Sequence, residues 1–344
     1  MRWRTQELFF RQLIARNLEI PVVGKVFFAF PAGSSTSLYE EWIETELDIP
    51  SELKFQGNNA ILNAYAEMSA GRNDTILAFP GAYTITNTDG LVWNKQNCHL
   101  IGLAGPNVRS DYSEPAVHLH TATAETAATF TISTSAYNCQ IHNMGFTNNG
   151  ASANNLAAVK INGRGAHFKN CMMMGIMNST QMAAVACHSL GIHSYGSHYL
   201  IENCKIGSTQ WGGARTTDDQ GQLCFTNTSG WPKPANGKFL NCLFESQSET
   251  AEVPMVRFAH VNAIDRMHMF ENCVFYNFST NWTNTCKEVF QYQGVVTNCI
   301  CLKDCMAIGY DEWQTLDYGT MFQSNMPVAT TGGGLAIEPT TSIA

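Results

Sequence analysis

The sequence predicts an all-β protein, a single-stranded right-handed parallel β-helix with an N-terminal arm, a helical cap and an extended C-terminal tail. Three observations favour this fold. A six-residue step, apolar–x–Asn–Cys–x–apolar, recurs along the chain, and the spacing between its copies varies. Charged residues make up only 14% of the sequence, below the roughly 25% of an average soluble domain. Asn, Thr, Ser and Gly make up much of the remainder, and these residues favour turns.

Each copy of the step fits one bend of a β-helical coil. Its first apolar residue points inward and the next points outward, because side chains alternate along a strand. Asn tolerates the left-handed backbone conformation that a sharp bend requires, and its amide can bond the equivalent amides above and below. The Cys and the last apolar residue then point inward. The predicted ladder consists of Asn143, Asn170, Asn203, Asn241, Asn272 and Asn298, with Cys171, Cys204, Cys242, Cys273 and Cys299 beside them.

The spacing of the ladder also favours a β-helix. Successive Asn residues of the ladder lie 27, 33, 38, 31 and 26 residues apart. A helical repeat of fixed length would not vary this much, whereas a β-helix accommodates extra residues as loops outside the coil. The alternative is an Asn-rich β-sandwich in which six matches arise by chance.

Three regions follow from this pattern. Residues 1–57 lack the repeat and are expected to form an arm, with short helices over residues 4–18 and 39–46. Residues 58–310 are expected to form the β-helix, which opens with a helix over residues 61–68 that caps the open end of the solenoid. Residues 311–344, which include Gly332, Gly333 and Gly334, are expected to form an extended tail.

The first predicted coil carries a recognisable pattern. After the capping helix come residues 74–85, which read D-T-I-x-x-x-P-G-x-Y, and then residues 97–102, which read N-x-x-L-x-G. This pattern resembles the first coil of pectate-lyase-like parallel β-helix proteins. The resemblance extends at the level of the fold to the trimeric β-helix proteins of bacteriophage virions, and it covers about residues 58–310. It implies a rod of stacked coils, and fold analogy alone does not imply a function.

The chain has 12 cysteines, no CxxC motif and five cysteines at one repeated position. We therefore expect a stack of buried, reduced thiols. Disulfide bonds are the alternative.

The phase of the step also assigns the outer surface. The outward residue before each Asn is mostly polar, whereas the outward residue after the Cys is mostly apolar. The predicted apolar stripe consists of Met172, Leu243, Val274 and Ile300. An exposed apolar surface of this kind usually marks a protein contact, so we expect it to be an interface that a homotrimer buries.

Candidate catalytic residues are few. The only adjacent acids in the repeat region are Asp218 and Asp219, which are weak candidates for the two carboxylates of a glycosidase. Residues 87–90 read N-T-D-G, as in polygalacturonases, but the GHG and RIK motifs of that family do not occur. Acids are too sparse in the coils for the calcium site of a pectate lyase. We expect these acids to be turn residues.

No metal site and no cofactor are expected. His188, His193 and His198 fall within one predicted coil, but a separation of five residues places neighbours on opposite faces of a strand. His118 and His120 share one face. Trp211, Trp231, Tyr195 and Tyr199 could stack against sugars, or they could form a subunit contact.

The net charge of −8 and the lack of any basic run disfavour a nucleic-acid surface. No apolar segment is long enough to span a membrane, and the N-terminus lacks the apolar run of a signal peptide. The sequence therefore predicts a structural virion protein of a bacteriophage, such as a capsid decoration (cement) protein or a short spike, found in the virion. Its arm and tail would contact the major capsid protein or another virion protein. The alternative is a carbohydrate-active β-helix enzyme, either a phage depolymerase or a polysaccharide lyase or hydrolase.

Overall fold

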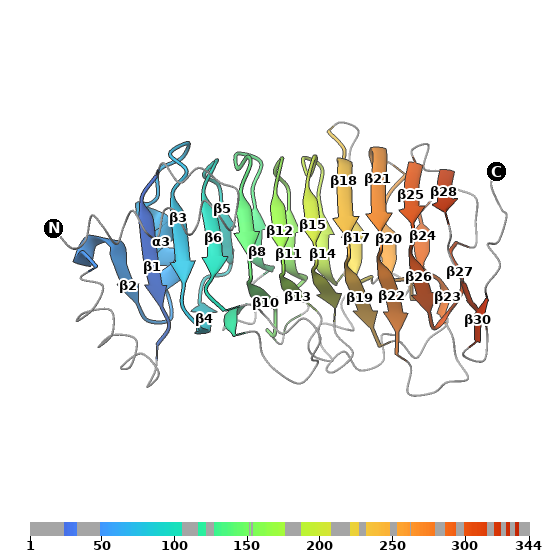
Figure 1. The fold of residues 1–344 in the computed structure, drawn as a ribbon, viewed down its shortest axis with the longest axis horizontal. Helices are drawn as coiled ribbons and strands as arrows, with labels where there is room; N and C mark the ends of the chain where they lie inside the picture. The colour runs from blue at the N-terminus through green and yellow to red at the C-terminus, as the bar shows by residue number, and fades with distance from the viewer. Residues whose placement is uncertain are drawn as a thin grey trace.

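The bends of successive coils stack the strands into three parallel sheets that run along a rod, as the computed structural model shows (Figure 1). Each coil contributes one strand to each sheet, and β29–β30 is the antiparallel pair among the described strands. The structure describes residues 24–32, 49–104, 116–121, 127–150, 152, 154–175, 187–207, 221–226, 232–247, 253–261, 263–278, 286–293, 299–314, 320–324, 328–330 and 334–336.

The sheet that precedes the Asn ladder has eleven strands. In spatial order they are β2 (Lys54–Gln56), β1 (Val26–Phe30), β3 (Thr75–Ala78), β6 (His99–Gly102), β9 (Gln140–His142), β12 (His167–Lys169), β15 (Leu200–Glu202), β18 (Ala235–Leu240), β21 (Asp265–Glu271), β25 (Cys299–Lys303) and β28 (Thr320–Ser324).

The sheet that follows the ladder has ten strands. They are β30 (Gly334–Ala336), β29 (Val328–Thr330), β26 (Met306–Ile308), β22 (Val274–Asn277), β19 (Leu243–Ser246), β16 (Lys205–Gly207), β13 (Met172–Met174), β10 (Gly145–Thr147), β7 (Val117–Thr121) and β4 (Gly81–Ile85).

The third sheet has seven strands and completes each coil. They are β24 (Phe290–Tyr292), β20 (Val256–Phe258), β17 (Leu223–Phe225), β14 (His188–Ile192), β11 (Ala157–Ile161), β8 (Ala128–Ile132) and β5 (Leu91–Trp93). A separate pair joins β23 (Cys286–Glu288) to β27 (Tyr310–Glu312).

A helix closes the N-terminal end of the rod, as the sequence predicts. The α-helix α3 (Ala60–Glu67) follows the short 3₁₀ helix η2 (Ser51–Leu53) and β2. It buries Ala60, Ile61, Ala64 and Tyr65 in the core, and the Tyr65 ring stacks on Trp93 at 4.2 Å between centroids. The helix therefore covers apolar side chains of the first coil that a bare solenoid end would expose.

The sheets extend beyond both predicted boundaries. β1 and β2 lie within residues 1–57, which the sequence assigns to an arm, yet β1 pairs in parallel with β3. At the other end β28 pairs with β25 inside the predicted tail. The apolar run at residues 26–30 carries no Asn–Cys step, which is why the repeat did not reveal it as a strand. The predicted helices over residues 4–18 and 39–46 lie outside the described residues.

In five consecutive coils the bend after the eleven-stranded sheet contains one left-handed Asn. The φ angles of Asn143, Asn170, Asn203, Asn241 and Asn272 lie between 52° and 56°. Their amides bond one another along the rod: Asn241 Nδ2 donates to Asn203 Oδ1 at 3.1 Å, and Asn272 Nδ2 donates to Asn241 Oδ1 at 3.2 Å. The side chain thus both tolerates the bend and links neighbouring coils.

The last ladder step lies six residues later than the sequence predicts. Phe270 pairs with Leu302 and Glu271 with Lys303, so Asp304 (φ 52°) and Cys305 occupy the positions expected for Asn298 and Cys299. Cys299 instead begins β25, and Asn298 lies outside the described residues. Asp also tolerates the left-handed conformation, so it substitutes for Asn at this bend.

Buried thiols line the rod beside the ladder. Cys171, Cys204, Cys242, Cys273 and Cys305 are at most 2% exposed, and each thiol approaches a carbonyl oxygen of the preceding coil. The ten cysteines whose side chains are described are all free thiols. Burial raises the pKa of Cys204 and Cys273 well above the usual value, which disfavours the reactive thiolate.

Aromatic rings stack from coil to coil inside the rod. Phe239 lies 4.7 Å from Phe270, with an interplanar angle of 4°. Phe244 stacks on Phe275 at the same distance, and Phe258 stacks on Tyr292 at 4.6 Å. These distances match the roughly 4.8 Å separation of neighbouring strands, so one residue type can repeat at the same position without leaving a void.

The outer face of the eleven-stranded sheet carries cations and anions on alternating coils. Lys169 pairs with Glu202 at 3.0 Å, and two coils further Glu271 pairs with both Lys238 and Lys303 at 2.6 Å. Hydrogen bonds from the two lysines lower the pKa of Glu271 to about 2. This face is polar, as the sequence predicts.

Three histidines are buried in the neutral form. Burial lowers the pKa of His99 and His268 to about 4 and that of His142 to about 3. His268 lies inside the rod, where the Tyr199 hydroxyl is 2.8 Å from its Nδ1 and the Pro234 carbonyl oxygen is 3.2 Å from its Nε2. The Tyr199 hydroxyl therefore donates to Nδ1 while the Nε2 proton is donated to Pro234.

The ladder predicts a specific order of stability. Asn241→Ala should lower the free energy of unfolding by about 2 kcal/mol, because alanine is strained in the left-handed conformation and the amide bonds are lost. Asn241→Gly loses the same bonds without the strain and should cost less. Urea unfolding of the two variants measures both values. Equal losses would show that the left-handed bend does not depend on Asn241.

The buried histidines predict destabilisation by acid. In the unfolded chain they take up protons near pH 6.5, whereas in the fold they do so only near pH 3 to 4, so stability is lost as the pH falls through this window. Between pH 7 and pH 5 each histidine should lower the free energy of unfolding by about 2 kcal/mol. Urea unfolding at both pH values tests this, and His142→Gln should reduce the difference. A fold equally stable at both values would contradict the assignment.

Candidate functional site

A second column of left-handed residues follows the turns that lead from the seven-stranded to the eleven-stranded sheet. Parallel bridges join Tyr137 to Arg164, Arg164 to Ser197 and Ser197 to Ala235, and Ala235 pairs with Asp265. These turns are therefore stacked in register. The residues that follow the bridged positions all have a positive φ, between 52° and 65°; they are Asn138, Gly165, His198, Asn236 and Arg266.

Two members of this column depart from the usual chemistry. Asn and Gly occupy the other three positions; His198 (φ 54°) is of a residue type that is also enriched in the left-handed conformation, whereas Arg266 (φ 59°) adopts it at a cost. Strained backbone of this kind gathers at functional sites. Both residues line one pocket, so the strain coincides with a concave surface.

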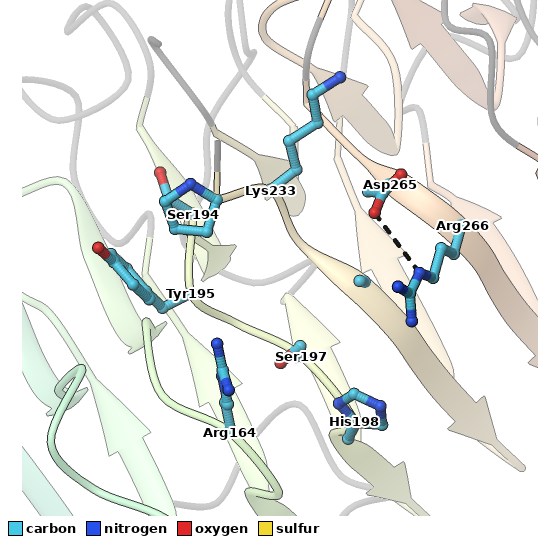
Figure 2. Close-up of a pocket in the computed structure, with 10 residues that line it drawn as sticks. Arg164, Ser194, Tyr195, Ser197, His198, Lys233, Asp265 and Arg266 are labelled. Atoms are coloured by element: carbon cyan, nitrogen blue, oxygen red, sulfur yellow. Dashed lines mark ion pairs between the residues drawn. The ribbon is translucent and has the colours of Figure 1, made fainter. Parts of the chain in front are cut away.

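That pocket has a volume of about 240 Å³ and spans four successive turns (Figure 2). Arg164 and the Tyr195 ring lie on one side, Arg266 lies on the other, and Ser197 and His198 lie between them. The complete lining consists of Arg164, Ser194, Tyr195, Ser197, His198, Pro232, Lys233, Ala235, Asp265 and Arg266.

A second pocket continues the first towards the N-terminal end of the rod. It has a volume of about 410 Å³, and it shares Arg164 and Tyr195 with the first pocket. Tyr137 lines its far side, with Thr134 and Ser135. Tyr137 and Tyr195 are 40% and 41% exposed, which is unusual for large aromatic side chains. We call the two pockets together the turn groove.

The turn groove is cationic although the chain as a whole is acidic. Three cationic side chains, Arg164, Lys233 and Arg266, line it against a single carboxylate, that of Asp265. Asp265 and Arg266 form a long ion pair of 3.7 Å, with Arg266 65% exposed. Such an exposed pair is weak, so the Arg266 guanidinium can also serve an anionic ligand.

The sequence did not identify the turn groove. Tyr195 was singled out as a residue that could stack against sugars, and it lines the groove, but Tyr199 is buried and bonds His268 inside the rod. Trp211 and Trp231 lie outside the described residues. Arg164 and Arg266 belong to no repeated motif. Arg164 is a bridged residue, Arg266 is the left-handed residue that follows one, and only the stacking of these turns brings them to the same groove.

The predicted catalytic candidates are not assembled into a site in the described part of the chain. Asp218 and Asp219 lie outside the described residues. Residues 87–90 form a turn in which Gly90 has φ +70° and its amide donates to the Asn87 carbonyl at 3.4 Å. A Cβ on Gly90 would collide with the Ala128 carbonyl oxygen, so this glycine is required by close packing. This N-T-D-G segment is a turn, as expected.

The histidines do not form a metal site within the described residues, where no group of three or more potential ligands converges. His118 and His120 share the outer face of β7, with their rings 5.2 Å apart. The prediction that His188 and His193 lie on opposite faces is wrong. Both approach Gly191 from the same side, because the amides of Ser189 and Leu190 both donate to the Gln222 carbonyl, a bulge that shifts the alternation of side chains after His188.

Polar side chains also cross the outer face of the seven-stranded sheet. Register places Lys160, Gly191, Cys224 and Arg257 in one row, and the ring of His193 lies above Gly191. Cys224 and Arg257 are 1% and 5% exposed. Burial lowers the pKa of His193 well below its usual value, and the charge of Lys160 adds to this effect. The row is polar, and most of it is closed to solvent.

The predicted apolar stripe is only partly correct. Leu243 and Val274 are half-buried on the outer face of the ten-stranded sheet. Met172 is 1% exposed, so it offers no surface to a partner. The prediction for Ile300 is wrong, because this residue lies in the core. The last ladder step is at Cys305, and Met306 therefore takes the outward position.

The corrected surface is a patch near the C-terminal end of the rod. Tyr276 and Ile308 lie beside the row of Leu243, Val274 and Met306, and all five are half-buried. We call these five residues the apolar patch. Within the described residues no helix is long and apolar enough to cross a membrane.

No protein-family model matches the sequence, and no curated protein matches it. Solved structures do match. A pectin methylesterase in complex with a hexasaccharide has a TM-score of 0.58 and 13% identity, over 91% of this chain and 93% of that chain. The pectin methylesterase of Erwinia chrysanthemi has a TM-score of 0.51 and 12% identity, over 89% and 90%. The product of ORF18 of Geobacillus virus E2 has a TM-score of 0.36 and 13% identity, over 78% and 56%.

At this identity the likeness concerns the fold. The sheets described above and the two pectin methylesterase structures agree that the chain is a parallel β-helix.

Proposed function

We propose that this chain is a structural protein of a bacteriophage virion, a capsid decoration protein or short spike that assembles as a homotrimer. The observation that carries the proposal is the apolar patch. Leu243, Val274 and Met306 follow one another on adjacent strands, and Tyr276 and Ile308 form a second row beside them. A β-helix alone gains nothing from apolar side chains on its outer face, whereas association removes them from water.

Two further features support an assembled role. Coils that contact only their neighbours make a stiff rod, which suits a protein that holds a position in a particle. Residues 1–57 and 311–344 include segments outside the repeat, and we propose that they contact the major capsid protein or another virion protein. We therefore expect the protein to be found in the virion.

A second candidate is a carbohydrate-active enzyme, a depolymerase or a polysaccharide lyase or hydrolase. The observation that favours it is the half-buried cation Lys160 on the outer face of the seven-stranded sheet. Asp218 and Asp219 precede β17, the strand that carries Cys224, and would supply the carboxylates.

The apolar patch predicts the oligomeric state. Light scattering of the full chain at micromolar concentration should give three times the 37.9 kDa mass of one chain. Val274→Glu should dissociate the trimer, because it places a carboxylate in the buried interface. Met267→Glu is the matched control, since Met267 is 43% exposed on a different sheet. A monomeric wild-type protein would contradict the proposal.

The enzyme candidate predicts release of reducing or unsaturated sugars from a polysaccharide panel. Asp218→Ala with Asp219→Ala should abolish release while leaving the unfolding transition unchanged. Wild-type protein that releases no sugar from any polymer, or a double variant as active as wild type, would remove this candidate.

A further inference from the structure

We propose that the turn groove binds an anionic glycan, a saccharide chain that carries carboxylate or phosphate groups, and holds it without cleaving it. This site belongs to a single chain, so the proposal does not depend on the trimer or on the virion role. It rests on the charge of the turn groove, on its exposed aromatic rings and on the strained backbone at its rim.

The first argument is the placement of charge. Arg164, Lys233 and Arg266 come from three different turns that stack in register. Because neighbouring coils lie about 4.8 Å apart, the cations are spread along the rod instead of meeting at one point. Spread cations suit a ligand with repeated anionic groups, and the planar guanidinium of arginine can bond a carboxylate or a phosphate through two N–H groups.

The second argument is the pair of exposed tyrosines. Tyr137 and Tyr195 both line the second pocket, and Arg164 lies in that pocket with them. From Tyr137 to Arg266 the turn groove covers five successive turns, a length of about 19 Å at the usual strand separation. The C–H face of a sugar ring packs on an aromatic ring while its hydroxyl groups remain in water, so a saccharide chain can use both kinds of side chain.

The third argument is the backbone strain at the rim of the turn groove. Of the four coils that line the first pocket, two use Gly165 and Asn236 at the left-handed position and two use His198 and Arg266. The His198 ring lies 3.2 Å from the side-chain amide nitrogen of Asn236. Asn at either position would serve the backbone better. The side chains of His198 and Arg266 point to a role that Asn does not fill, and both lie at the surface of the pocket.

The chemistry of the turn groove excludes the closest alternatives. A nucleic acid carries one phosphate per nucleotide and requires a dense basic surface, whereas this chain has a net charge of −8 and three cations in the groove. Hydrolysis of a glycosidic bond by the usual mechanism requires two carboxyl groups that flank the bond. The described lining offers only the Asp265 carboxylate, which is paired with Arg266.

The test measures binding of the full chain to four probes of matched length by isothermal titration calorimetry. The probes are an oligogalacturonate, its fully methyl-esterified form, a poly(glycerol phosphate) and a single-stranded oligodeoxynucleotide. We expect the oligogalacturonate or the poly(glycerol phosphate) to bind at least about tenfold more tightly than the esterified form and the oligonucleotide. Which of the two binds more tightly identifies the anionic group.

Variants separate the turn groove from general charge effects. Arg164→Gln should weaken binding at least about tenfold, and Tyr195→Ala should weaken it as well. Lys303→Gln removes the same charge from the outer face of the eleven-stranded sheet and should leave binding unchanged. Arg266→Asn should weaken binding and also raise the melting temperature, because asparagine relieves the left-handed strain; a purely structural role for Arg266 would not produce both effects.

Three results would overturn the proposal. One is an equal affinity for the charged and the esterified oligosaccharide, or no binding of either anionic glycan at millimolar concentration. Another is an oligonucleotide that binds as tightly as the glycans. The third is a loss of binding in Lys303→Gln as large as that in Arg164→Gln.

Discussion

Much of the rod depends on one backbone constraint: from the coil of Asn143 to that of Asp304, a residue enters the left-handed conformation at the bend between the eleven-stranded and the ten-stranded sheet. Asn satisfies it in five consecutive coils and Asp304 in the next. Once that bend is set, the next strand begins in a fixed phase, with a thiol and then an apolar side chain facing inward. The thiol stack, the aromatic stacks and the division of the surface into faces all follow from this phase.

The sequence revealed this constraint because Asn and Cys are chemically distinctive and recur together. The fold class, the helical cap and five of the six predicted ladder positions could be read in this way. The last coil could not, since Asn298 and Cys299 imitate the motif while Asp304 and Cys305 occupy the bend. Because of this one error in phase, Ile300 was predicted to lie on the surface, although it lies in the core. The first strand, β1, was missed for the opposite reason, because it is a strand without the motif.

The turn groove was beyond the reach of the same reasoning. Its column of left-handed residues uses Asn138, Gly165, His198, Asn236 and Arg266, which share a conformation but no chemistry. Only the stacking of the turns in the folded rod shows that these positions are equivalent. Burial of outward residues was equally hidden, because Met172 points away from the core and is nevertheless closed to solvent. A repeat predicts the direction of a side chain, but loops outside the repeat decide what covers it.

The alternating charges on the outer face of the eleven-stranded sheet restrict how the length of this rod can evolve. Lys169, Glu202, Lys238, Glu271 and Lys303 change sign from one coil to the next. Register places Leu240 between Glu202 and Glu271, so loss of the β18 coil alone would bring these two carboxylates next to each other, whereas loss of the β18 and β21 coils together would bring Glu202 next to Lys303.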